Sequence, residues 1–177
     1  MLPPITYLGW MHTGCGIAAI LIGGYALHKY KVISFSERAA KIYLLLTFIT
    51  AATALAIYNQ GGFRIAHVLA VLTLLALIAG IIVEKTYMLG SLSKYFFTLC
   101  YTSTFLFHMI PAITDTLRRL PVGDPFASSL DDPLVVSFHA LFFLIFILSY
   151  LWQVQWLKRE TQSINQNEII YDSCWVL

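Results

Sequence analysis

Four of the five histidines in this 177-residue sequence lie inside long apolar stretches, where an ionisable side chain is costly and marks a candidate functional site. Neutral imidazole ligates zinc, copper, iron and the iron of haem. These histidines are therefore candidate ligands of a transition metal (Cu, Fe or Zn) or of haem b. They are His12, His67, His108 and His139, each in a different stretch.

Three polar residues at helical spacing from these histidines extend the candidate site. Tyr101 and Asp115 share the helical face of His108, and Asp115 is placed to orient a histidine of another helix. Arg64 precedes His67 by one helical turn, where it would meet an anionic group such as a haem propionate. We take Arg64, Tyr101 and Asp115 as candidate cofactor-binding residues. The alternatives are simple solvation for Asp115 and pairing with lipid phosphates for Arg64.

Small residues follow His12 on one face of its stretch. Cys15, Ala19 and Gly23 recur at four-residue spacing, which lets another helix or a flat porphyrin come close. Cys15 is also a candidate soft ligand. Plain helix packing is the alternative for the whole strip.

The composition indicates which elements hold these residues. The sequence is 59% hydrophobic and 11% charged, with a mean hydropathy of +0.76, whereas a soluble domain is roughly 25% charged. Helices are the form expected for long, continuous apolar runs that cross a bilayer of ~30 Å. We predict an all-α polytopic membrane bundle over residues 1–157 and a polar tail over residues 158–177. The five predicted transmembrane helices cover about 5–27, 39–58, 63–83, 93–117 and 134–157.

Boundary residues support these spans. Asn59–Gly62 is a predicted turn between the second and third helices. Asp131 or Asp132 is predicted to cap the fifth helix, with Pro133 in its first turn. Glu84 is interpreted as part of an ordinary helix end.

The basic residues predict the orientation of the bundle. Eight of them fall on one side of the predicted topology and three on the other, which favours a cytoplasmic location for the larger group. The N-terminus is then outside and the C-terminus is cytoplasmic. The larger group is Lys29, Lys31, Arg38, Lys41, Lys85, Lys94, Lys158 and Arg159, and the smaller is Arg64, Arg118 and Arg119.

In this topology the four histidines lie at similar depths. At ~1.5 Å per helical residue, His12 is about 10 Å, His67 about 6 Å, His108 about 13 Å and His139 about 8 Å from the outer boundary. Four imidazoles in one band of the outer leaflet can converge on a metal or a haem. Since consecutive helices are usually neighbours, His67, His108 and His139 rank first as ligands. The alternative is that the histidines are hydrogen-bonding glue between helices.

Two resemblances follow from these residues. Gly9–Thr13, Gly61–Phe63 and Phe107–Pro111 with Asp115 resemble features of small multi-pass proteins of bacterial inner membranes, which implies that location and no particular activity. The histidine-bearing bundle is also similar in kind to b-type cytochromes. That similarity implies haem between histidines of facing helices and electron exchange with quinone. Because only His28 lies near the cytoplasmic side, a single haem near the outer face is expected.

The sequence therefore favours a membrane redox-type protein, a membrane oxidoreductase if it is an enzyme. Its expected partners are the lipid bilayer and a quinone or other redox partner on the outer face. The competing function is a non-enzymatic small transporter, accessory subunit or assembly factor. A net charge of +2 without a basic cluster argues against nucleic acid, and the three separated cysteines argue against a thiol oxidoreductase.

Overall fold

The computed structural model describes residues 5–58 and 62–174, and these ranges are all-α, as the sequence predicts. Five helices in the described ranges are long and apolar enough to cross a membrane. The first three residues of the predicted turn at Asn59–Gly62 lie outside these ranges. The elements are α1 (Tyr7–Tyr30), α2 (Arg38–Leu55), α3 (Ile65–Thr86), the 3-10 helix η1 (Gly90–Leu92), α4 (Ser93–Arg119) and α5 (Pro133–Cys174).

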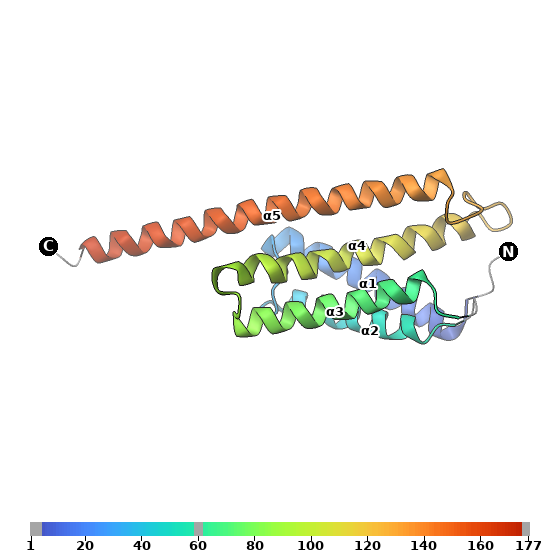
Figure 1. Ribbon diagram of the computed structural model, residues 1–177, viewed down its shortest axis with the longest axis horizontal. Coiled ribbons are helices and arrows are strands. Elements are labelled where there is room, and N and C mark those ends of the chain that lie inside the picture. Colours follow the sequence, from blue (N-terminus) through green and yellow to red (C-terminus); the bar gives the residue numbers. More distant parts are fainter. Residues whose placement is uncertain (1–4, 59–61, 175–177) are drawn as a thin grey trace.

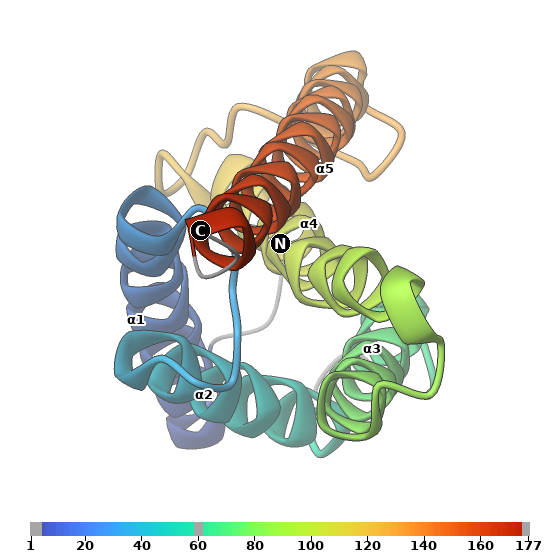
Figure 2. The same cartoon turned by 90° about the vertical axis from the view of Figure 1, so that its left-hand side faces the viewer.

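Helices α1 to α4 follow one another around the bundle, and α5 packs outside them against α4 (Figure 2). The start of α1, the end of α2, the start of α3 and the α4–α5 loop lie at one end, here called the N-terminal end (Figure 1). The last part of α5 projects beyond the opposite, C-terminal end. Only 6% of the apolar membrane-crossing part of α5 is buried inside the chain, so most of this helix surface is available for contact with lipid.

The helix boundaries agree with the predictions in some places and differ in others. The Asp132 carboxylate accepts a hydrogen bond from the Leu134 N–H at 3.0 Å, which confirms the predicted cap of α5. Helix α2 ends at Leu55, three residues before the predicted end. Helix α5 continues to Cys174 instead of ending near 157, because residues 158–174 contain neither glycine nor proline.

Large aromatic side chains fill the C-terminal half of the bundle interior. Tyr43 and Tyr101 are fully buried, and the rings of Tyr43 and Phe105 stack at 4.9 Å. Gly23 is required for this packing, because a Cβ there would lie 2.5 Å from both Tyr43 and Phe105. Gly80 is required in the same way beside Tyr101. The Gly23 end of the small-residue strip on α1 therefore serves helix packing.

Glu84 is a buried anchor, so its interpretation as an ordinary helix end was wrong. Its carboxylate accepts hydrogen bonds from the Ser34 hydroxyl at 2.6 Å, the Phe35 N–H at 2.7 Å and the Tyr101 hydroxyl at 2.7 Å. These bonds tie the α1–α2 loop to α3 and α4. Hydrophobic spacing could not reveal this role, because the partners come from two distant segments.

Replacing Glu84 by glutamine is expected to destabilise the bundle by about 1–3 kcal/mol, because charge-assisted hydrogen bonds are lost from a buried site. Thermal unfolding in detergent measures this as a lower Tm, at about 2–4 °C per kcal/mol for a chain of this size. Glu160→Gln, at an exposed position on α5, is the matched control. Equal Tm values for the two variants would contradict the anchoring role.

Candidate functional site

A cavity of about 940 Å³ occupies the N-terminal half of the bundle, between α1, α2, α3 and α4 and under the α4–α5 loop. Several residues that line it are small, whereas aromatic rings fill the other half of the bundle. On α2 and α3 these small residues recur at one-turn spacing, which places them on one face of each helix. The small residues include Gly16 on α1, Ala51 and Ala54 on α2, Ala66, Ala70 and Thr73 on α3, and Ala112 on α4.

The polar part of the cavity wall comes mainly from α1 and α4. His12, His108 and Asp115 all line it. Arg118 and Arg119 complete the wall at the end of α4. A mostly apolar cavity with a few converging polar groups is the usual form of a ligand site.

The hydrogen bonds of His12 determine which of its nitrogens carries the proton. Its Nδ1 lies 3.0 Å from the Thr50 carbonyl oxygen, which can only accept, so Nδ1 carries the proton. The Thr53 hydroxyl donates to backbone oxygens and accepts from the same Nδ1–H at 3.3 Å. The lone pair of His12 is therefore on Nε2. Histidines that ligate metals are commonly oriented in this way, through a backbone carbonyl on the other nitrogen.

A hydrogen bond to α2 holds His108 at the cavity wall. Its Nε2 lies 3.1 Å from the Thr47 hydroxyl. Nearby, the Thr104 hydroxyl donates to the Tyr101 carbonyl at 2.7 Å, so it accepts from the Tyr43 hydroxyl. The hydrogen bond described for His108 uses Nε2 and does not involve Nδ1.

His67 and His139 lie elsewhere and do not line this cavity. The Arg64 N–H donates to Nδ1 of His67 at 3.1 Å, so the lone pair of His67 is already used. Its ring is buried between Tyr58 and Phe63, and its Nε2 has no hydrogen-bond partner among the described residues. His139 bonds through Nε2 to the Thr114 hydroxyl at 2.8 Å, across the contact of α5 with α4.

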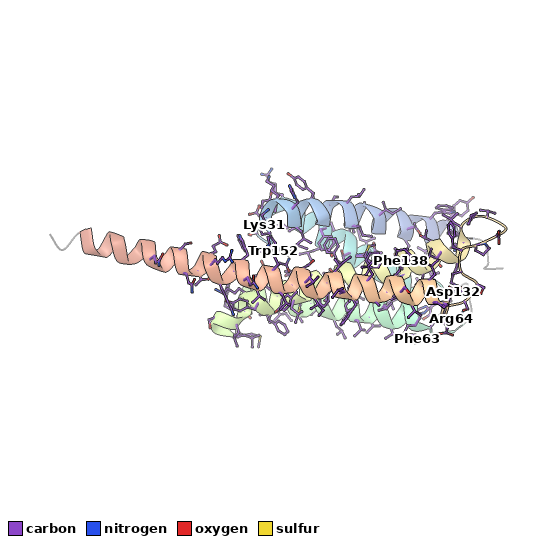
Figure 3. The ribbon with its side chains drawn as sticks, turned by 90° about the horizontal axis from the view of Figure 1, so that it is seen from above. Lys31, Phe63, Arg64, Asp132, Phe138 and Trp152 are labelled. Atoms are coloured by element: carbon purple, nitrogen blue, oxygen red, sulfur yellow. The ribbon has the colours of Figure 1, made fainter. Side chains whose placement is uncertain are left out.

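The other sequence candidates are divided between the cavity and more distant sites. Asp115 lines the cavity and forms an ion pair with Arg119 at 3.4 Å. Tyr101 lies in the aromatic half, bonded to Glu84. Arg64 is exposed at the N-terminal end, beside Phe63 and outside the cavity wall (Figure 3). Cys15 is partly buried and also lies outside the wall.

The structure thus brings together two of the four candidate histidines, with Asp115. Within residues 5–58 and 62–174, no group of three or more His, Cys, Asp or Glu side chains gathers as a metal site would require. Neither the cavity nor the hydrogen bond between Thr47 and His108 was predicted from the sequence. The signal for Thr47 is a polar residue one turn from Tyr43 on the inner face of α2. Comparison of the chain with protein-family models, with curated proteins and with solved structures finds no match.

Proposed function

We propose that this protein is an integral membrane protein of redox type that holds haem b in the cavity at its N-terminal end. One observation carries the proposal: imidazoles from two helices that are not sequence neighbours, His12 on α1 and His108 on α4, line a single apolar cavity of about 940 Å³. That volume is within the range of sites that enclose a small-molecule ligand or cofactor, roughly 300–1,000 Å³. Histidine is a common axial ligand of haem iron.

The ligand count favours haem over a compact transition-metal centre. A structural or catalytic metal centre commonly uses three or four protein ligands, whereas haem iron needs at most two because the porphyrin supplies the rest. The cavity offers two imidazoles, and the hydrogen bonds described for them use one ring nitrogen each, Nδ1 of His12 and Nε2 of His108. The other nitrogen of each ring is the one that would bind iron.

We place the cavity in the outer leaflet of a bacterial inner membrane, with the C-terminus in the cytoplasm. This proposal is supported by the distribution of the basic residues. Eight of them lie toward the C-terminal end of the bundle and three toward the N-terminal end. Bound haem would supply one-electron chemistry there, and a quinone or another redox partner on the outer face would exchange electrons with it. His12 and His108 would hold the iron, and the apolar wall would exclude water.

Orientation has its own test. A cytoplasmic reporter fused after Leu177 is expected to be active, and a periplasmic reporter at the same point inactive, because the basic end of the bundle stays inside. A reporter inserted in the α4–α5 loop is expected to give the opposite pair of results and serves as the internal control. Periplasmic activity after Leu177 would place the cavity in the inner leaflet and contradict the proposed site of electron exchange.

A second candidate function is a non-enzymatic small transporter, accessory subunit or assembly factor. It is favoured by the hydrogen bonds of the histidines. His12, His108 and His139 each bond to a residue of another helix and so stabilise the contacts between helices. The absorption spectrum of the purified protein separates the two functions. A Soret band supports haem, metal content without this band supports a non-haem centre, and colourless, metal-free protein from replete cells supports the second candidate.

A further inference from the structure

Arg118 supplies a buried donor to the cavity that the proposed haem ligation does not use. It lies in the last turn of α4 and lines the cavity. Its Nε is buried and has no hydrogen-bond partner among the described residues. A buried donor left without an acceptor is costly, and guanidinium never loses its charge to avoid that cost. A favourable position at the C-terminal end of the helix dipole explains a basic residue here, but not its place on the cavity wall.

The ion pair described at this end of α4 does not include Arg118. The Asp115 carboxylate pairs with Arg119 at 3.4 Å, one turn away along α4. Within the described part of the chain, no ion pair is formed by Arg118. The α4–α5 loop adds apolar residues to the same cavity wall, namely Leu120, Val122 and Pro125. A buried guanidinium nitrogen with no acceptor among the described residues therefore lies at one end of a largely apolar cavity.

We propose that the occupant of the cavity is an amphiphile that carries a carboxylate, and that Arg118 receives this carboxylate. The inference rests on the proposed function only in taking the cavity as the ligand site. The apolar body would lie among the small residues of α1 to α4, and the head group would lie beside the last turn of α4, at the N-terminal end of the bundle. The planar fork of guanidinium matches a carboxylate with two parallel hydrogen bonds, so an acid fits better than a neutral head.

Two sources share this chemistry, namely the propionates of haem and the head group of a fatty acid. The test uses the 177-residue chain, produced in cells unable to make haem and purified in dodecyl maltoside. The probes are two matched pairs: protoporphyrin IX with its dimethyl ester, and cis-parinaric acid with its methyl ester. Each ester keeps the apolar body and removes the charge. Fluorescence titration gives the Kd of each probe, and the metal-free porphyrin makes the result independent of ligation by His12 or His108.

The expected result is that the acid of at least one pair binds about 10–100-fold more tightly than its ester, which corresponds to one buried charge-assisted pair. Arg118→Gln should reduce the affinity of the acid to that of the ester and leave ester binding unchanged, which also shows that the variant is folded. Arg64→Gln is the matched control, since Arg64 lies at the same end but outside the cavity wall.

Each outcome has a defined meaning. A response of the porphyrin pair identifies the propionates as the carboxylate source. A response of the fatty-acid pair alone supports the Arg118 site while removing support from haem as the occupant. Equal affinity of acid and ester, loss of discrimination in Arg64→Gln instead of Arg118→Gln, or no binding of any probe would overturn the inference.

Discussion

Protein purified after His12→Ala or His108→Ala substitution is expected to lose most of its haem, whereas His67→Ala and His139→Ala are expected to retain it. An axial imidazole supplies a lone pair that alanine lacks, so the loss of either ligand removes a bond to iron rather than a packing contact. The two cavity histidines should therefore act alike. The measurement is the Soret absorbance per folded protein, with folding checked by size-exclusion chromatography and Tm.

The four substitutions form a matched set, because each removes one imidazole that makes a hydrogen bond in the folded chain. A general loss of stability would affect all of them, whereas ligation separates the cavity pair from the other two. His28→Ala at the exposed C-terminal end of α1 is a further control and should have no effect. Retention of haem in both His12→Ala and His108→Ala would contradict the proposed ligand pair. The histidines would then serve only as hydrogen-bonding contacts between helices.

The fold was largely predictable because membrane spans are set by length and hydropathy, both of which are local properties. The five spans were located within a few residues for this reason. The continuation of α5 past residue 157 was missed because hydropathy predicts only the part of a helix that crosses the bilayer. The helix itself can continue through polar residues that contain no glycine or proline. Glu84 was misread because its three donors come from the α1–α2 loop and α4.

The candidate site was only partly predictable, because depth along a helix does not give rotation about its axis. His67 and His108 lie in the same predicted band, yet His108 faces the cavity and His67 packs between the rings of Tyr58 and Phe63. The ranking that placed His12 last relied on sequence order. In the bundle, α1 instead reaches the same cavity as α4, which brings His12 onto the wall with His108. Small residues at one-turn spacing were the available signal for that cavity.

Filling the cavity is expected to exclude its ligand without removing any histidine. Ala70 is 5% exposed and lines the cavity on α3, so Ala70→Phe places a ring where the porphyrin would lie. Forcing extra atoms into an occupied space costs about 1–3 kcal/mol, which corresponds to a loss of haem affinity on the order of 10–100-fold. In the haem-free protein the same ring fills empty volume, so its Tm should stay equal or rise.

The neighbouring residue on α3 provides the control for this substitution. Val71 is 37% exposed and does not line the cavity, so Val71→Phe adds a ring of the same size to the outer surface of the same helix turn. It should keep both the Soret band and the Tm. Titration of haem into the two variants compares their haem affinities. A loss of affinity in Ala70→Phe alone is due to the filled cavity, because Val71→Phe adds the same ring to α3 outside it. Equal haem affinity in Ala70→Phe and Val71→Phe would mean that haem binds elsewhere, because the ring of Phe at position 70 and a porphyrin between α1 and α4 compete for one volume.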